Sequence, residues 1–297
     1  MRGLRSFLGL LVILLALGAY LYFVESKRTP GDDASRKDKV FAVEADKIDE
    51  VTIRSEAGET TTLKKSAEEW QIVAPAAAQP DGAEISGITT NLATLEQQRV
   101  IDEKPADLKP FGLAEPRIEI TFKAGGQEEK LLIGSKTPTG ADLYAKKATQ
   151  PTVFLIASYL ESTFNRSTFD LRDKTALKFD RDGADRLEIA TAGRTLTFAK
   201  SGGTWSITEP KVDRPDTAAI EGLVGRLTGI QMKTLAAAEP DGLKKYGLEN
   251  PAATVRIGSG SSLATLLLGS AAEEGAIHAR DASRPPSSLS RRACSMT

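Results

Sequence analysis

The sequence predicts an α+β protein in which an N-terminal transmembrane helix is followed by two tandem repeats of one mainly antiparallel sheet-plus-helix unit. The helix is predicted from residues 7–24, an apolar segment without a charged side chain. The repeats are predicted from the two tryptophans of the chain, Trp70 and Trp205. Each tryptophan begins the same passage, in which a short apolar strand reaches a proline and an aspartate then starts a helix.

The composition is that of a globular protein large enough for two domains. The chain has 297 residues, of which 40% are hydrophobic and 27% charged. Its 39 basic and 40 acidic side chains leave a formal charge of -1, so nothing favours nucleic acid as a partner. Cys294 is the single cysteine, which excludes an internal disulfide.

Residues 7–24 match a membrane-spanning helix in length and in their flanks. A helix of this length rises about 27 Å, close to the thickness of the hydrocarbon layer. Arg2 and Arg5 precede it, and Tyr20 and Tyr22 lie at its far end, where aromatic side chains meet the membrane surface. A cleaved signal peptide is the alternative. Its apolar region would be shorter and would be followed by a small-x-small cleavage site, so a retained anchor is favoured.

The rest of the chain divides around this anchor. Residues 1–6 are predicted to be a cytoplasmic tail and residues 25–39 a polar linker. The first repeat is expected over 40–170 and the second over 177–285. Basic residues on both sides of the anchor leave the charge rule undecided, but a short tail before a large domain is typical of a signal-anchor. We therefore expect the bulk of the chain on the periplasmic or extracytoplasmic side of the cytoplasmic membrane.

In the first repeat, three strands ending at Trp70 are predicted to precede a helix. Asp81 is a suitable N-cap, with Glu84 three residues later as the partner of a capping box. The apolar stripe of the helix should cover the sheet face that carries Trp70; it consists of Ile85, Ile88, Leu92 and Leu95. The second helix has the stripe Ile220, Leu223, Leu227 and Ile230.

A short helical turn and four strands are predicted to complete the first repeat. Pro105 is expected at the first position of the turn, Gly112 as its left-handed C-cap, and Leu113 against Leu108. Alternating patterns predict strands at 117–123, 128–133, 143–146 and 152–156, with a closing helix near 158–161.

The end of the second repeat departs from this plan. Residues 286–297 are neither periodic nor apolar, although a strand should begin after Pro285. One permitted codon choice for this tail, read in another frame, encodes VFTVEACLLDD and so restores a strand. We therefore expect an aberrant, frameshifted tail, an unpaired sheet edge in the second repeat, and no function for Cys294.

These motifs resemble an uncharacterised bacterial family of membrane-anchored proteins, classed as a domain of unknown function. The resemblance is carried by the W-x-I-x-x-P strand of Trp70, the L-K-x-[FY]-G-L-x-x-P turn and the L-L-I-G-x-x-x-P-x-G segment at 131–140. Genes of this family often stand beside those of gliding-motility-type ABC transporters. The resemblance implies an accessory protein exposed outside the cytoplasmic membrane, and it implies no catalytic residue.

No catalytic, cofactor-binding or metal-binding residue is predicted. His278 is the one histidine, and it is better interpreted as an ordinary strand residue than as a ligand or base. Gly125 and Gly126 lack the Gly-Lys-Ser/Thr ending of a phosphate-binding loop. The acidic pairs are expected to be solvated; they are Asp32-Asp33, Glu68-Glu69 and Glu273-Glu274.

Aromatic side chains are the remaining candidates for binding. Trp70 and Trp205 could form an exposed platform for a glycan or a partner, but their inward-facing strand positions favour the core. Trp70→Ala is then expected to cost about 3–5 kcal/mol of stability. Phe111 and Tyr246 are interpreted as anchors of the short turns.

Three functions follow from these patterns. The favoured one is a non-enzymatic accessory or scaffold protein of an ABC-type transport system, anchored through residues 7–24 and in contact with protein partners. The alternative is a cell-envelope module that binds glycan or lipid and would need an exposed tryptophan. An envelope hydrolase would need a reactive cluster of side chains that the sequence does not suggest.

Overall fold

The computed structural model describes residues 38–236, 242–283 and 294–296. The cytoplasmic tail predicted for residues 1–6, the anchor predicted for 7–24 and almost all of the predicted linker lie outside these residues. Within the described part, no helix is both long and apolar enough to cross a membrane.

The predicted α+β class is wrong. Among the described residues, 44% are in strands and 17% in helices, so the protein is mostly antiparallel β-sheet. The strands form two eight-stranded sheets, one in each half of the chain. Seven of the eight strands of the first half were predicted, but among the described helices only the two with apolar stripes are longer than five residues, so helices add little to the sheets.

The first sheet has the strand order β3-β2-β1-β5-β6-β7-β8-β4. Its strands are β1 (Ile48–Arg54), β2 (Thr60–Ser66), β3 (Glu69–Ala74), β4 (Arg99–Asp102), β5 (Ile118–Ala124), β6 (Gln127–Lys136), β7 (Asp142–Lys147) and β8 (Val153–Ala157). All of its pairs are antiparallel. The four strands predicted from β5 to β8 are confirmed within a few residues. β4 was not predicted, because this edge strand has only four residues, is mostly exposed and shows no apolar alternation.

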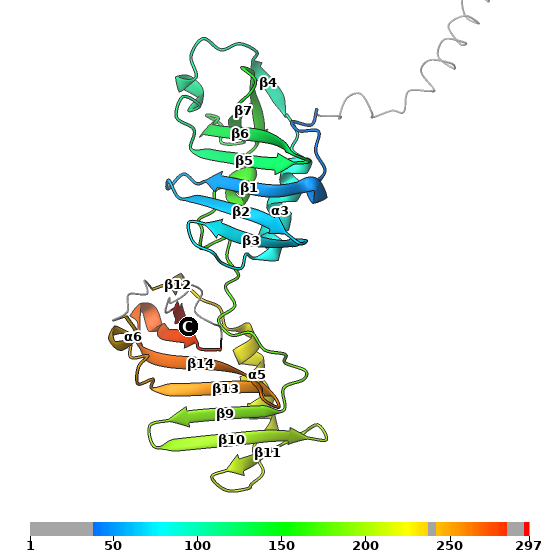
Figure 1. Cartoon of the computed structure of the whole chain (residues 1–297). Helices are drawn as coiled ribbons and strands as arrows, with labels where there is room; N and C mark the ends of the chain where they lie inside the picture. Colours follow the sequence, from blue (N-terminus) through cyan, green and yellow to red (C-terminus); the bar gives the residue numbers. More distant parts are fainter. Residues whose placement is uncertain (1–37, 237–241, 284–293, 297) are drawn as a thin grey trace, which may run out of the picture.

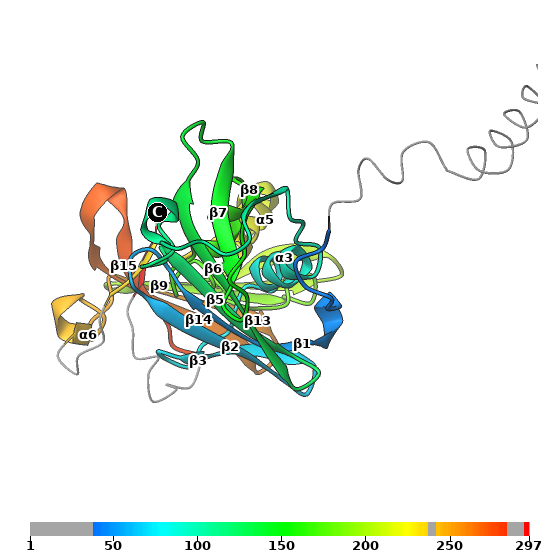
Figure 2. The same ribbon diagram turned by 90° about the horizontal axis from the view of Figure 1, so that it is seen from above.

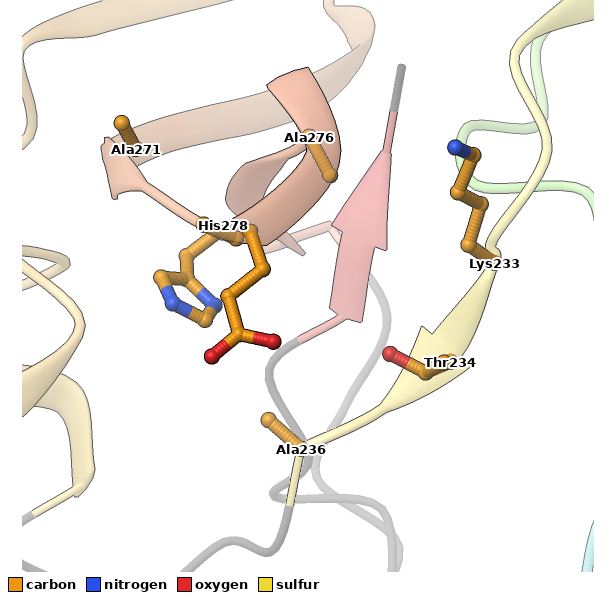
Figure 3. Close-up of a pocket in the computed structure, with 8 residues that line it drawn as sticks. Lys233, Thr234, Ala236, Ala271, Ala276 and His278 are labelled. Carbon is orange, nitrogen blue, oxygen red and sulfur yellow. The ribbon is translucent and has the colours of Figure 1, made fainter.

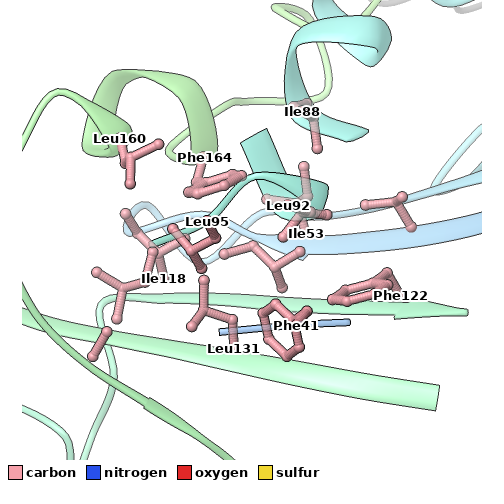
Figure 4. Close-up of a cluster of buried hydrophobic side chains, with 14 of the residues drawn as sticks. Phe41, Ile53, Ile88, Leu92, Leu95, Ile118, Phe122, Leu131, Leu160 and Phe164 are labelled. Carbon is pink, nitrogen blue, oxygen red and sulfur yellow. The ribbon is translucent and has the colours of Figure 1, made fainter. Parts of the chain in front are cut away.

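Helix α3 (Gly82–Ala93) packs on one side of the first sheet (Figures 1 and 2). As predicted, Asp81 is its N-cap, because the Asp81 carboxylate accepts the backbone N–H of Ala83 at 2.9 Å. Glu84 does not complete a capping box; it forms an ion pair with Arg166 at 2.9 Å instead. The predicted stripe is buried in a core that also includes Phe41, Ile53, Phe122 and Phe164 (Figure 4).

A short helix, η3 (Lys109–Phe111), stands where the helical turn was predicted. The turn begins later than expected, with Pro110 rather than Pro105 near its start. Gly112 has a φ of 65°, so the predicted left-handed C-cap is confirmed. The N–H of Leu113 donates to the carbonyl of Leu108 at 3.1 Å. The other short helices of this half are η2 (Ala45–Lys47) and α4 (Leu160–Phe164), the predicted closing helix.

The second sheet has the order β11-β10-β9-β13-β14-β15-β16-β12, which corresponds strand for strand to the first. Its strands are β9 (Arg186–Thr191), β10 (Arg194–Ser201), β11 (Thr204–Glu209), β12 (Thr234–Leu235), β13 (Ala253–Ser259), β14 (Ser262–Ala271), β15 (Ile277–Asp281) and β16 (Cys294–Met296). Its helices are α5 (Thr217–Gly229), α6 (Gly242–Lys245) and η4 (Glu273–Gly275). The repeat is loose in detail, because β12 and β16 are shorter than β4 and β8.

The second core repeats the first with smaller side chains. In α5, Ile220 and Leu227 are buried as predicted, but Val224 is buried where Leu223 and Ile230 remain only partly buried. Asp216 caps this helix by accepting the backbone N–H of Ala219 at 3.1 Å.

The expected loss of the last strand of the second repeat is wrong. β16 pairs antiparallel with β15 on one side and with β12 on the other, which is the place of β8 in the first sheet. Cys294 therefore belongs to a strand, although the preceding residues 284–293 lie outside the described part. The frameshift in the tail stays a prediction.

The two halves are joined by a segment that hydrogen-bonds to both. Asp173 donates its N–H to the carbonyl of Gln79 in the first half at 2.9 Å. Ala176 donates to Ile230 at 3.0 Å, and Met232 donates to Lys174 at 2.7 Å, both linking to the second half. The first hydrophobic core ends with Leu171 and the second begins with Ala176. Figure 1 shows the first sheet in the upper half of the view and the second sheet below it.

Candidate functional site

The first candidate cavity lies beside β12 and β15 in the second half. It has a volume of about 730 Å³ and opens between Lys233, Thr234, Glu273 and His278, with alanines completing the wall (Figure 3). Short side chains leave the space open, since four of the lining residues are alanines. The cavity therefore combines an ammonium, a hydroxyl, a carboxylate and an imidazole group.

His278 stands on β15 and packs against an aromatic ring. Its ring centroid lies 4.5 Å from that of Tyr246, at an interplanar angle of 42°. In the first half, Phe111 and Tyr144 make the matching contact at 5.1 Å and 60°. His278 thus occupies the place of Tyr144, which agrees with its interpretation as a strand residue. Its Nδ1 is buried and has no hydrogen-bond partner among the described residues.

A second cavity lies at the junction of the two halves and has a volume of about 380 Å³. It shares Lys233 and Thr234 with the first cavity, so the two cavities adjoin β12. Its remaining lining comes from the first half, the joining segment and β12; these residues are Glu59, Pro75, Ala76, Thr168, Phe169, Arg172 and Leu235. The polar lining of the junction was not foreseen, because its members are separated by up to 175 positions, from Glu59 to Thr234.

The two cavities are suited to binding, and their chemistry is limited. No group of three or more His, Cys, Asp or Glu side chains able to hold a metal occurs in the described part of the chain. Lys233 and Arg172 can contact an anion, and the threonine hydroxyls can donate or accept hydrogen bonds.

The two tryptophans differ in their surroundings. Trp205 is 2% exposed, as predicted for a core residue, and its indole N–H donates to Glu221 Oε1 at 2.7 Å. Lys200 Nζ donates to the same oxygen at 2.9 Å, and this hydrogen bond is the main cause that lowers the pKa of Glu221. Trp70 is only half-buried and packs against the edge of the first core.

The other residues singled out in the sequence have structural surroundings. Phe111 and Tyr246 anchor the short turns through the ring contacts described above. Glu68 lies in a turn with a φ of 70° and pairs with Lys65 at 2.8 Å. Gly125 and Gly126 form the turn between β5 and β6 with positive φ. Glu273 and Glu274 belong to η4, whereas Asp32 and Asp33 lie outside the described residues.

A charged network on the first half was not predicted from the sequence. Arg117 Nε donates to Glu56 Oε1 at 2.8 Å, and its Nη2 donates to Glu161 Oε1 at 2.7 Å. Lys136 binds the other oxygen of Glu161 and is the main cause that lowers the pKa of that carboxyl group. The hydrogen bond to Glu56 raises the pKa of Arg117. The network ties the start of β5 to the β1–β2 turn and to α4, so its role is structural.

Comparison with curated proteins and with solved structures finds no match. A family model matches the chain twice, over residues 70–215 and 205–286. The first match begins at Trp70 and the second at Trp205, the two residues that stand at matching places in β3 and β11. Together the matches cover well over half of the sequence, so the chain belongs to the family described as "Domain of unknown function (DUF4340)".

Proposed function

We propose that this chain is a membrane-anchored, extracytoplasmic accessory or scaffold protein of an ABC-type transport system. In this proposal residues 7–24 hold the chain in the cytoplasmic membrane, and the two sheets contact protein partners of the transporter. The chain acts by binding and carries out no reaction.

The observation that supports the proposal most is the duplicated strand order. Two sheets of the same order are joined by a segment that hydrogen-bonds to both, through Asp173 to the first half and Ala176 to the second. A single polypeptide with two related sheets can present two similar surfaces to partner proteins, as a scaffold protein does. The apolar character of residues 7–24 supports the membrane anchor. The resemblance to proteins encoded beside ABC transporters supports a transporter subunit as the partner.

Exposed apolar side chains indicate where a partner would bind. Val212, after β11, is 74% exposed, and Tyr159, after β8, is 65% exposed. The two do not form a continuous apolar patch, so they serve as separate positions at which a contact can be tested. One of them lies in each half of the chain.

The alternative, a glycan- or lipid-binding module, has less support. It requires the flat face of a tryptophan to be open to solvent. Trp205 is 2% exposed, and Trp70 packs half-buried against the first core.

The proposal is tested by recovering partners of the full chain from native membranes. Cells of the source bacterium carrying a tagged chain are cross-linked, the membranes are extracted in a mild detergent, and the captured proteins are identified by mass spectrometry. We expect the chain in the membrane fraction together with a permease or ATPase subunit of an ABC transporter. Capture without any transporter subunit, or a chain that leaves the membrane in alkaline carbonate, contradicts the proposal.

Surface variants then locate the contact. Val212→Asp and Tyr159→Asp place a charge on the two exposed apolar sites, and at least one of them should reduce capture of the transporter subunit about tenfold. Glu128→Gln, an exposed position within β6, is the matched control and should leave capture unchanged. Equal capture by all three variants excludes these two sites as the contact.

A further inference from the structure

The junction cavity is built by parts of the chain that meet only in the folded molecule. Glu59 comes from the turn before β2, and Pro75 follows β3. Thr168 to Arg172 belong to the joining segment, and Lys233 to Leu235 reach the cavity from β12. Cavities between two structural units are preferred places for small ligands, and a volume of about 380 Å³ lies within the usual range for them.

The lining has a polar part that suits an anion. Arg172 offers a guanidinium group, which can grip two oxygens of a phosphate, and Lys233 offers an ammonium group. Thr168 and Thr234 add two hydroxyl groups to the same wall. Arg172 is fixed at its backbone, because it forms an isolated bridge with Pro80.

The single carboxylate of the lining is turned toward the protein backbone. Glu59 Oε2 accepts the N–H of Thr168 at 2.9 Å, which holds this carboxylate against the joining segment. Within the lining, the two cations Arg172 and Lys233 outnumber this carboxylate.

The lining also has an apolar part, and the fold of the edge strand does not require Lys233. Phe169, Leu235 and Ala76 provide apolar surface beside Arg172 and Lys233. Gln98 stands 135 positions before Lys233, at the matching place before β4 of the first sheet. The first half thus forms its edge strand without a lysine at this position.

From this arrangement we infer that the junction cavity binds a small organic phosphate. The phosphate group contacts Arg172 and Lys233, and the organic part lies on Phe169 and Leu235. Binding bridges β12 of the second half to the joining segment and so holds the two halves together. This inference does not depend on a transporter partner, and each can fail without the other.

The same phosphate chemistry can come from a soluble metabolite or from a lipid headgroup. The full chain in detergent, in a buffer free of phosphate, is titrated with glycerol phosphate by calorimetry. In a second arm, the chain is mixed with vesicles containing phosphatidic acid, with phosphatidylcholine vesicles for comparison. Binding of glycerol phosphate identifies a soluble phosphate ester, and binding confined to phosphatidic acid identifies a lipid headgroup.

Variants of the lining assign the binding to this cavity. Arg172→Gln and Lys233→Gln should each weaken binding about tenfold or more, because each removes one charged contact to the phosphate. Glu59→Gln should strengthen binding, since it removes a negative charge and keeps an oxygen that can accept the Thr168 N–H. Lys211→Gln, which removes an exposed charge outside the cavity, is the matched control.

The melting temperature of each unliganded variant separates loss of binding from loss of folding. Lys233 is exposed, so the melting temperature of Lys233→Gln should equal that of the wild type, even if Arg172→Gln melts at a lower temperature. Absence of binding to both probes overturns the inference. Binding that Lys233→Gln and Lys211→Gln weaken equally also overturns it, because the phosphate would then follow general surface charge.

Discussion

At the level of single residues, Trp70 and Trp205 occupy equivalent strand positions but differ in how deeply they are buried. Trp70 pairs with Lys65 across the sheet and Trp205 pairs with Lys200, so their registers are equivalent. Trp205 is buried in the second core and its indole N–H donates to Glu221 of α5, whereas Trp70 is only half-buried. The inward-facing strand position could be predicted from the sequence. The burial of the ring depends on how the helix packs over the strand.

Trp205→Ala is expected to lower the free energy of unfolding of the second half by about 3–5 kcal/mol, since it empties a closed site and removes a hydrogen bond. Trp70→Ala should cost about 1–2 kcal/mol, less than the sequence suggested, because part of its ring already contacts water. Urea denaturation followed by circular dichroism measures both. An equal cost for the two variants would mean that Trp70 is as enclosed as Trp205.

The Glu161 carboxylate should make stability depend on pH. Lys136 first, and then Arg117, lower the pKa of Glu161 in the folded chain relative to the unfolded chain. A lowered folded pKa means that the stabilisation is fully present above the ordinary glutamate pKa and is lost as pH falls through the folded value. Glu161→Gln should therefore cost about 1 kcal/mol or less near pH 7 and almost nothing below about pH 3.

Chemical denaturation of wild type and Glu161→Gln between about pH 7 and pH 3 provides the measurement. Glu128→Gln, at an exposed position within β6, serves as the control and should leave the pH profile unchanged. A difference that grows as pH falls would have the wrong sign for this ion pair.

At the level of elements, each short turn packs against a glycine in a neighbouring strand. A Cβ at Gly134 in β6 would lie 2.1 Å from the carbonyl oxygen of Phe111, and a Cβ at Gly269 in β14 would lie 2.1 Å from that of Tyr246. These contacts are far shorter than atoms tolerate, so the backbone would have to move. The two glycines are the reason that turn and strand can approach so closely in both halves.

Gly134→Ala and Gly269→Ala should each destabilise their half by about 1–3 kcal/mol through this clash. Gly87→Ala in α3 is the matched control: a Cβ there meets nothing within 4 Å, and alanine should stabilise the helix by about 0.5–1 kcal/mol. Thermal melting distinguishes the two signs. Unchanged melting of Gly134→Ala would show that the turn can shift away without cost.

On the scale of the whole molecule, the two halves have separate hydrophobic cores that differ in the size of their buried side chains. Among the described residues, the core of the second half contains four alanines, Ala176, Ala184, Ala264 and Ala279, whereas that of the first contains only Ala145. Alanine removes little apolar surface from water, so it contributes less to stability than the larger side chains of the first core. The second half should therefore be the less stable one.

Each half contains one tryptophan, so its unfolding can be followed separately. Trp70→Phe leaves Trp205 as the fluorescence probe of the second half, and Trp205→Phe leaves Trp70 as the probe of the first. In urea, the Trp205 signal should change at a lower concentration than the Trp70 signal. Coincident transitions for both probes and for circular dichroism would instead mean that the junction makes the chain one cooperative unit.

The sequence alone determined those features that depend on neighbouring residues. Asp81 and Asp216 mark the helix starts because an N-cap needs only the next few backbone N–H groups. Gly112 marks the left-handed end of a turn for the same local reason. The matching passages around the two tryptophans likewise predicted two related units.

Tertiary structure alone decided the strand order and the candidate site. β4 and β8 come together although a short helix and three strands separate them in the chain, and this pairing gives the first sheet one of its edges. The junction cavity gathers Glu59, Arg172 and Lys233 from three distant segments, and none has a local signature. Contacts between distant residues depend on how whole sheets and helices pack, so no short stretch of sequence records them.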